Sequence, residues 1–377
     1  MKIGIVCYPT YGGSGVVATE LGKGLAQKGH EVHFITYEQP TRLDFFSENI
    51  FFHKVDIKTY PLFEYPPYEL ALASKMVSVV QSEKLDLLHV HYAIPHASSA
   101  FMAKQILRTR NITIPVVTTL HGTDITLVGR DEIYEPVVSF SINQSDGVTS
   151  VSEHLKEETL ADFHITTDID VIPNFIDLQR FQKQKKEHFK RAICPHGEKL
   201  LIHTSNFRKV KRVDIVIELF AKLKEHIPAK LLLIGDGPER NHIEDACHTL
   251  GIYDDVRFLG KLEAVEEVLS VGDLFLMPSE KESFGLAALE AMASGVPVIS
   301  SNTGGLSEVN LQGESGFLSN VANVSEMAQN AIKILEDDEV LLRFKKRAKE
   351  VAKKFDTKNI VPLYEAMYEN ALNGIML

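Results

Sequence analysis

The chain has 377 residues, of which 44% are hydrophobic and 24% are charged. This length exceeds what one ordinary hydrophobic core holds, so the composition predicts a soluble globular protein of two domains. The formal net charge of −11 disfavours non-specific binding to nucleic acid, because the overall field repels an anion.

No apolar run approaches the roughly 20 residues that a membrane span needs. Residues 3–7 read as a buried strand directly after Met1 and Lys2, and no signal-peptide pattern precedes it. The three cysteines are scattered and match neither metal nor disulfide spacing. We therefore expect a cytoplasmic protein that does not bind a membrane. The sequence leaves open whether the chain forms a homo-oligomer.

Short apolar runs alternate with amphipathic stretches along the chain, which is typical of doubly wound parallel sheets. In the first half the pattern predicts strands at residues 3–7, 32–36, 85–90, 116–120, 147–151 and 169–172, and a helix over 13–28. In the second half it predicts strands at 200–203, 230–234, 256–259, 274–277 and 297–300. We expect α/β domains over residues 1–172 and 173–355, divided at the step 173–177, and a last helix within 356–377.

The loop after the first strand leads into a helix at Gly13, Ser14 and Gly15, whose free amides favour an anion. The segment also matches a dinucleotide fingerprint, with Glu38 at about the distance of a ribose contact. Residues 8–12 make the loop longer than that fingerprint allows. A substrate-contacting loop is therefore favoured over a plain turn or a nicotinamide site.

Histidines follow two of the predicted strands. His89, His91 and His96 lie close together, but no carboxylate or fourth ligand accompanies them, so we expect no metal site. His121 precedes Gly122, which allows close backbone approach. The pattern leaves a structural and a ligand-facing His121 equally open.

Basic residues follow the first strand of the second half, at Arg208 and Lys211. An arginine offers bidentate contacts to a diphosphate and a lysine offers a mobile point charge. Fixed cations of this kind stabilise the charge of a leaving diphosphate. The alternative is a helix start with solvated bases. Lys211 is the strongest candidate in this segment.

Two glutamates eight residues apart, Glu282 and Glu290, frame a Gly-containing turn and a helix. We expect Ser283 as the N-cap and a helix over residues 286–293. Along the helix the two carboxylates are then roughly 12 Å apart. Free amides at the helix start point the same way as Glu282. The arrangement suits a sugar nucleotide; the alternative is a surface helix with two solvated glutamates.

Together these features resemble retaining glycosyltransferases of family four, which have the GT-B architecture. The resemblance rests on residues 233–238, 256–260, 282–290, 293–297 and 304–308 as a set, and it covers essentially the whole chain. It implies two Rossmann-like domains with an interdomain cleft and a C-terminal helix that crosses back to the first domain. It also implies a hexosyltransferase without a cofactor, and we expect no metal requirement because the fixed cations do its work.

The resemblance also assigns roles to single residues. Glu282 matches the family glutamate that contacts the donor sugar, and Glu290 matches the one that holds the ribose. Asn206 stands where the family usually has an arginine, so Arg208 is expected to substitute for it. His121 matches the histidine near the reacting sugar. The implied catalytic residues are His121, Glu282 and Lys211, and the implied donor site is Asn206, Arg208, Lys211, Ser283, Phe284, Gly285, Leu286 and Glu290.

Residues 9–15, 89–95, 172–177 and 205–212 resemble, more narrowly, family members that join N-acetylglucosamine from its UDP donor to L-malate in bacillithiol biosynthesis. The acceptor is expected on the first domain, at Gly13, Ser14, Gly15, Tyr92 and Thr119. Three alternatives remain: a transferase with another acceptor (inositol phosphate, a lipid or a polysaccharide), a UDP-sugar epimerase, and a sugar-binding module. A nicotinamide oxidoreductase would leave both motif glutamates unexplained.

Overall fold

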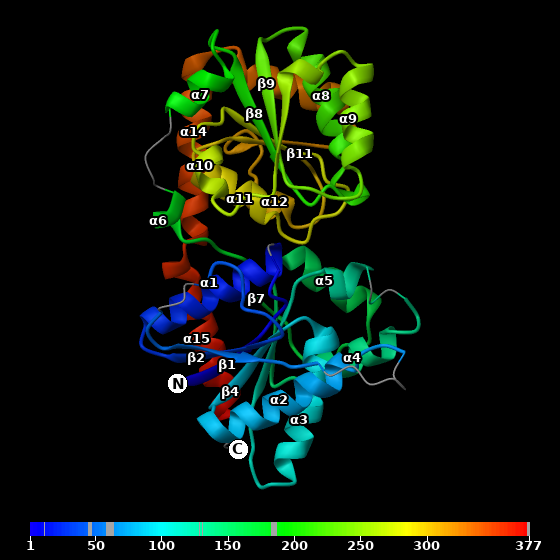
Figure 1. Cartoon of the computed structure of the whole chain (residues 1–377), viewed down its shortest axis with the longest axis vertical. Coiled ribbons are helices and arrows are strands. Elements are labelled where there is room, and N and C mark those ends of the chain that lie inside the picture. The colour runs from blue at the N-terminus through cyan, green and yellow to red at the C-terminus, as the bar shows by residue number, and fades with distance from the viewer. Residues whose placement is uncertain are drawn as a thin grey trace. The chain divides into compact units, whose positions relative to one another are not determined.

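The computed structural model describes residues 1–10, 12–43, 47–57, 64–127, 129, 131–181 and 187–374. The chain forms two compact units (Figure 1): one comprises Met1–Asn174 and Thr357–Leu377, and the other comprises Phe175–Asp356. Each unit is an α/β domain built on one parallel sheet. The predicted fold class, with two Rossmann-like sheets, is confirmed.

The sheet of the N-terminal unit has seven strands in the order β3-β2-β1-β4-β5-β6-β7. These are β1 (Lys2–Val6), β2 (Glu31–Thr36), β3 (Ile50–Lys54), β4 (Leu87–His91), β5 (Val116–Leu120), β6 (Gly147–Ser150) and β7 (Asp170–Val171). The strand order reverses between β1 and β4, which pair with Ile5 opposite His89. Open parallel sheets bind ligands at such a switch point, outside the carboxyl ends of the strands.

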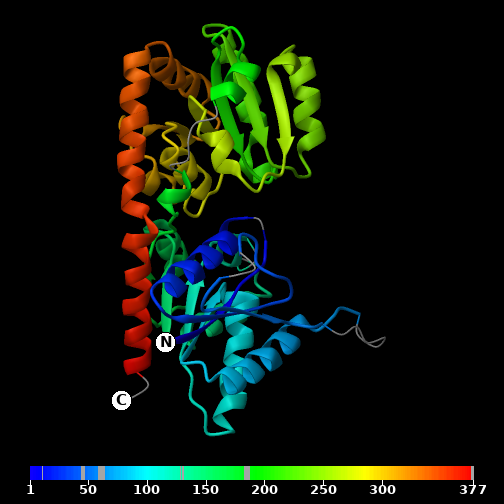
Figure 2. The ribbon, with the colours of Figure 1, turned by 60° about the vertical axis from the view of Figure 1, so that its left-hand side comes forward.

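Helices cover both faces of this sheet. They are α1 (Gly13–Gln27), α2 (Tyr68–Glu83), α3 (Ser98–Arg108), α4 (Glu135–Asn143), α5 (Glu153–Asp162) and α15 (Thr357–Asn373), with the π-turns η1 (Ala93–Ala97) and η2 (Thr123–Leu127). Leu88 and Val90 of β4 face α2 and α3 in one buried cluster. His89 alternates with them and faces α15, which lies beside α1 (Figure 2).

The sheet of the C-terminal unit has six strands in the order β10-β9-β8-β11-β12-β13. These are β8 (Lys199–Thr204), β9 (Ala229–Ile234), β10 (Val256–Gly260), β11 (Leu274–Met277), β12 (Val298–Ser301) and β13 (Gly316–Ser319). The strand order reverses between β8 and β11, so this unit has a switch point of its own.

The helices and short turns of the C-terminal unit are α6 (Leu178–Phe181), α7 (Glu187–Ile193), η3 (Lys209–Lys211), α8 (Val213–Lys224), α9 (Arg240–Thr249), η4 (Tyr253–Asp255), α10 (Val265–Leu269), α11 (Leu286–Ala293), α12 (Leu306–Val309), α13 (Val324–Leu335), α14 (Asp338–Ala352) and η5 (Lys353–Phe355). In α8, Val216, Phe220 and Leu223 recur at helical spacing and are fully buried. They join residues of α9 and α13 in the main core of this unit. The helix α11 contacts β11, β12 and α14.

Two observed strands are missing from the sequence prediction, and one predicted strand is shorter. The missing strands, β3 and β13, are the edge strands of the first and the second sheet. In β3, Phe51 and Phe52 are exposed, so the strand lacks the buried alternation on which the prediction relied. The strand predicted at residues 169–172 pairs only over Asp170–Val171, because it lies at the other edge of its sheet.

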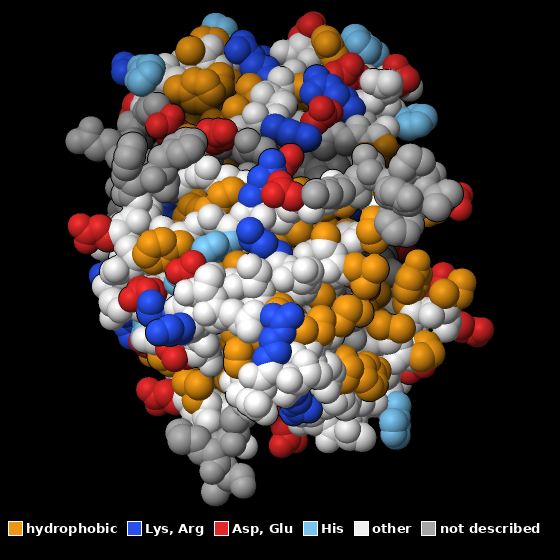
Figure 3. Space-filling model, turned by 60° about the horizontal axis from the view of Figure 1, so that its bottom comes forward, with side chains coloured by type: hydrophobic (Ala, Val, Ile, Leu, Met, Phe, Trp, Pro, Cys, Tyr) orange, Lys and Arg blue, Asp and Glu red, His pale blue; other side chains and the backbone are white. Residues whose placement is uncertain are grey.

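Exposed apolar side chains gather on one face of the N-terminal unit (Figure 3). Met102 of α3 and Val137 and Phe140 of α4 are among the exposed apolar side chains of this unit. The rings of Phe101 and Phe140 meet edge to face with their centroids 4.8 Å apart, so the packing of α3 on α4 continues to the surface. In the described part of the chain, no helix combines the length and the apolar character that crossing a membrane requires.

Three fully buried histidines belong to the core of the N-terminal unit. Burial lowers the pKa of His89 to about 3 and that of His96 to about 4, and it holds the pKa of His91 well below the usual value. Each ring is therefore neutral in the folded protein at pH 7. In the unfolded chain the same rings gain protons below pH 6.5.

We predict that the protein loses stability as the pH falls from 7 to 5. The stability from a lowered histidine pKa is complete above the unfolded pKa and is lost below it, by roughly 2 kcal/mol per ring at pH 5. Asp124, whose pKa burial raises to about 6, acts in the opposite direction. It is one group against these three histidines and others whose pKa burial also lowers, such as His121 and His203. Thermal unfolding followed by circular dichroism at pH 7, 6 and 5 checks this, and an unchanged midpoint would contradict it.

Candidate active site

The switch point of the C-terminal unit brings together two segments that the sequence analysis singled out. Residues 206–211 follow β8 and residues 280–285 follow β11. The Lys211 ammonium donates to a Glu282 carboxylate oxygen at 2.6 Å. The backbone amide of Glu280 donates to the Val210 carbonyl at 2.8 Å, which ties the two loops together. Two predicted catalytic residues therefore form one ion pair, with side chains only 21% and 15% exposed.

A glycine turn holds the Glu282 loop in place. The amide of Gly305 donates to the Glu282 carbonyl at 3.0 Å. A Cβ on Gly304 would lie 1.9 Å from that same carbonyl oxygen, and one on Gly305 would lie 2.4 Å from the Ser283 oxygen. The two backbones thus touch with no room for a side chain, and Gly304 also has a φ of +54°. The turn after β12 therefore fixes the position of Glu282.

A second glycine turn, after β9, holds the loop that carries the bases. A Cβ on Gly235 would lie 1.8 Å from the Ser205 carbonyl oxygen, and one on Gly237 would lie 2.0 Å from the Asn206 oxygen. Asn206 and Arg208 are both exposed on this loop. The two side chains thus face solvent, while the glycine turn after β9 holds the backbone of their loop in place.

The helix after Glu282 covers Leu286–Ala293, as the sequence predicts, but its N-cap is Gly285 and not Ser283. Gly285 has a φ of +102°, which only glycine adopts without strain, so the chain turns into the helix at that residue. Leu286 is the first helical residue, and the first amides of α11 have no partner within the helix.

The Phe284 ring is buried against Phe355, so only the backbone of Phe284 is left for a ligand. Glu290 is 7% exposed, on the second turn.

The switch point of the N-terminal unit brings together three strand ends. Ser14, in the first turn of α1, and Tyr92, directly after β4, share a hydrogen bond of 2.6 Å between their hydroxyls. The Tyr92 ring lies 5.3 Å from that of His121, which follows β5. Burial raises the pKa of Tyr92 to about 12, so its hydroxyl stays protonated. Three residues that the sequence placed on separate loops therefore lie together.

The backbone of this group is held under strain. Tyr92 has a φ of +88° and a ψ of +138°, a region that side chains other than glycine rarely adopt. Such strain costs about 1–3 kcal/mol and is typical of ligand sites. A Cβ on Gly15 would lie 2.5 Å from the Tyr8 carbonyl, so Gly15 allows the loop after β1 to pack against α1. Gly13 begins α1 with a φ of +20°, and Tyr11 lies outside the described residues.

His121 contacts another histidine. Its Nε2 lies 2.7 Å from Nδ1 of His91, and burial lowers the pKa of His121 to about 3. Asp124, which the sequence analysis did not assign, accepts from the amides of Ala93 and Gly122 at 2.8 and 3.1 Å. Its carboxylate thereby joins the loop after β4 to the loop after β5. In the sequence, the only feature that indicates this role is the position of Asp124, three residues after His121.

The carbonyl of Thr119 accepts from the Tyr92 amide at 2.9 Å, but the Thr119 side chain bonds to other residues. Its hydroxyl is 2.7 Å from Nε2 of His89 and 2.7 Å from the Thr149 hydroxyl, and all three side chains are fully buried. Thr119 precedes the end of β5 and faces the core toward α15. This placement does not favour the predicted contact between Thr119 and the acceptor.

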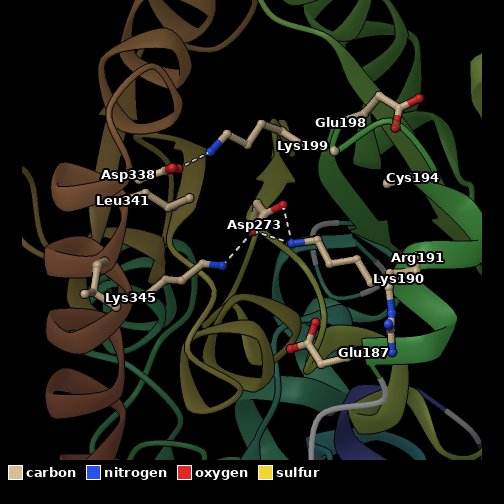
Figure 4. A pocket seen from close by; sticks show the side chains of 12 residues that line it. Glu187, Lys190, Arg191, Cys194, Glu198, Lys199, Asp273, Asp338, Leu341 and Lys345 are labelled. Atoms are coloured by element: carbon tan, nitrogen blue, oxygen red, sulfur yellow. Dashed lines mark hydrogen bonds and ion pairs between the residues drawn. The ribbon is translucent and has the colours of Figure 1, made fainter.

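A hollow of about 550 Å³ lies at the opposite, amino end of the second sheet (Figure 4). Asp273, directly before β11, is bound there by Lys190 at 2.7 Å and by Lys345 at 2.7 Å, and Lys199 donates to Asp338 at 2.5 Å. The lysines drawn in Figure 4 are therefore each bound to a carboxylate. No group of three potential metal ligands occurs among the residues that the structure describes.

Comparison with known proteins agrees with this geometry. Residues 11–180 match the model of the glycosyltransferase family 4 proteins, and residues 184–351 match that of glycosyl transferases group 1. The N-acetyl-alpha-D-glucosaminyl L-malate synthase of Bacillus anthracis is 50% identical over 99% of this chain and 97% of its own. The chain belongs to glycosyltransferase family four. It is therefore a hexosyltransferase by family.

Two solved structures of other proteins share the fold. Sucrose-phosphate synthase of Thermosynechococcus elongatus matches with a TM-score of 0.80 and 21% identity over 99% of both chains. Anabaena HepE, solved with UDP-glucose, matches with a TM-score of 0.82 and 20% identity over 98% of this chain and 99% of its own. These likenesses establish the GT-B architecture of this family-four chain.

We predict that Gly304→Ala weakens the binding of UDP about tenfold or more, because the new Cβ collides with the Glu282 carbonyl and displaces the loop. Gly313→Ala is the matched control. Gly313 has a similarly positive φ of +72°, but no atom lies within 4 Å of its added Cβ. Calorimetric titration of both variants with UDP checks this. Equal affinities would show that the contact does not hold the site.

Proposed function

We propose that this glycosyltransferase moves N-acetylglucosamine from UDP-N-acetylglucosamine to the hydroxyl of L-malate, the first step of bacillithiol biosynthesis. The observation that carries the proposal is the relative named N-acetyl-alpha-D-glucosaminyl L-malate synthase, 50% identical over nearly the whole chain. The Lys211–Glu282 pair at the switch point supports it, because it offers one cation and one carboxylate to a ligand that has both a diphosphate and a sugar.

The donor binds to the C-terminal unit. Lys211 and the exposed Arg208 neutralise the diphosphate, and Glu282 with the amides at the start of α11 holds the sugar. Glu290 holds the ribose from the second turn of α11. Because Glu282 already holds the Lys211 ammonium, the cation is positioned before the donor arrives. Fixed cations take the place of a metal ion in this proposal.

The acceptor binds to the N-terminal unit. The start of α1, with Gly13, Ser14 and Gly15, attracts the malate carboxylates, and the Tyr92 hydroxyl donates to one of them. The malate oxygen attacks the anomeric carbon on the face from which the diphosphate leaves. The bond from that carbon to the phosphate oxygen breaks, the bond to the malate oxygen forms, and the malate proton passes to the leaving phosphate. This course retains the donor's configuration, which fits the "alpha" in the relative's name.

The cell compartment is inferred from the cysteines. Cys7, Cys194 and Cys247 are all free and buried, as is usual in a reducing cytoplasm.

We predict that the enzyme releases UDP from UDP-N-acetylglucosamine with L-malate and not with inositol phosphate, glycerol lipids or no acceptor. A chelator should leave the rate unchanged. A coupled assay for UDP over a panel of hydroxy acids and these other acceptors checks this. Release of UDP with inositol phosphate but not with malate would identify inositol phosphate as the acceptor. Conversion of the donor without any acceptor would indicate an epimerase.

We predict that Lys211→Ala weakens UDP-N-acetylglucosamine binding at least about tenfold, the value of one charge-assisted hydrogen bond. Lys209→Ala, in the same η3 turn, is the matched control because Lys209 is exposed and carries the same charge. Its affinity should stay within about twofold of wild type, as for an exposed charge. Calorimetry with the donor checks both variants. Equal losses would assign the effect to general charge and remove Lys211 from the site.

A further inference from the structure

Three imidazoles form a stack that runs from the core of the N-terminal unit to the carboxyl end of its sheet. The ring centroids of His89 and His91 lie 4.5 Å apart at an interplanar angle of 30°, and those of His91 and His121 lie 5.0 Å apart at 25°. His89 and His91 are fully buried, whereas His121 is partly exposed. The stack thus connects a ring at the candidate site to rings that no ligand reaches.

The hydrogen bonds along this stack are nearly complete. Both nitrogens of His89 are bonded, Nδ1 to the Tyr368 hydroxyl and Nε2 to the Thr119 hydroxyl, each at 2.7 Å. Nδ1 of His91 and Nε2 of His121 share the next bond, also at 2.7 Å. Burial keeps both of these rings neutral at pH 7 because it lowers their pKa values far below it. In a bond between two neutral imidazoles, only one can be the donor.

The other nitrogen of His91 decides which ring donates. Nε2 of His91 is buried and has no hydrogen-bond partner among the described residues. If His121 donated, neutral His91 would carry its proton on Nε2, and a buried N–H would be left without an acceptor. If His91 donates through Nδ1–H, only a lone pair is left unmatched. Unmatched buried donors are rarer in proteins than unmatched acceptors.

We propose that His91 is a positioning residue that fixes His121 as the tautomer protonated on Nδ1. Nε2 of His121 then accepts from His91, and the Nδ1–H of His121 is the donor left for a ligand. No described residue bonds to Nδ1 of His121 in the structure, and the ring is partly exposed. Free histidine in water prefers the proton on Nε2, so the opposite tautomer is a distinctive consequence of this contact.

The chemical consequence rests on the proposed function. Glycosyl transfer passes through a transition state with positive charge on the sugar ring. A neutral Nδ1–H orients a sugar hydroxyl without placing a second positive charge beside that ring. A histidinium at the same position would oppose the reaction. His91 and the surrounding burial therefore keep His121 both neutral and correctly protonated.

The tautomer is tested directly on the full-length protein without ligand. Two-bond proton–nitrogen NMR correlations of protein labelled with ¹⁵N-histidine identify the protonated nitrogen of each ring, and loss of signals in His121→Asn assigns His121. We expect His121 on Nδ1 in the wild type and a shift toward Nε2 in His91→Phe. A wild-type His121 protonated on Nε2 would overturn the proposal. This readout needs no substrate, so it stands even if malate is not the acceptor.

Kinetics with matched variants test the consequence for turnover. His91→Phe keeps an aromatic ring and removes the N–H that donates to His121. We expect kcat to fall about tenfold or more, with the KM for the sugar donor nearly unchanged, as for loss of a residue that orients a ligand-contacting imidazole. His91→Asn places an amide donor near the position of Nδ1 and should restore most of the rate. His91→Gln places its amide near the position of Nε2 instead and should not restore the rate. His89→Phe, equally buried, should lower stability and leave the His121 tautomer unchanged. Equal rates in the Asn and Gln variants would reduce His91 to a packing role.

Discussion

The candidate donor site of the C-terminal unit depends on steric contact between backbones. At the carboxyl end of the second sheet, the turn at Gly304 lies against the Glu282 loop, and the turn at Gly235 lies against the Ser205 carbonyl, with no room for a Cβ in either place. The hydrogen bond from the Glu280 amide to Val210 then joins the two supported loops. The ion pair between Lys211 and Glu282 forms because these two loops bring the side chains within hydrogen-bond distance.

The candidate acceptor site of the N-terminal unit is held together differently. Its loops are joined by polar side chains: Ser14 to Tyr92, and Asp124 to the amides of Ala93 and Gly122. The histidine stack lies next to these loops, and its hydrogen-bonded rings occupy core positions that apolar side chains usually fill. A neutral polar core of this kind costs stability at low pH, but it orients the groups above it more closely than aliphatic packing would.

Much of this arrangement could be predicted from the sequence. The helix at residues 286–293 and the strands at 116–120 and 274–277 have the predicted bounds, because their apolar runs end in clear Gly, His or Pro steps. The edge strands β3 and β13 could not be found, since one side of each lacks a strand partner and their sequences lack a buried pattern. Ser283 resembled an N-cap, but the left-handed turn at Gly285 begins the helix. Contacts between distant loops, such as Lys211 with Glu282 or His91 with His121, have no local sequence pattern and depend on which strands become neighbours.

The charged cluster around Asp273 has a consequence for where the C-terminal unit attracts an anion. Four basic side chains line the hollow at the amino end of the second sheet, and four carboxylates line it with them: Lys190, Arg191, Lys199 and Lys345, with Glu187, Glu198, Asp273 and Asp338. Because these charges balance, this end of the sheet has little attraction for a dianion. At the other end of the sheet, Arg208 and Lys209 are exposed on the loop after β8 and offer positive charge in a chain of net charge −11. The C-terminal unit thus has little tendency to bind an anion at the amino end of its sheet. An anion that diffuses toward this unit is therefore attracted to the end that carries the candidate site.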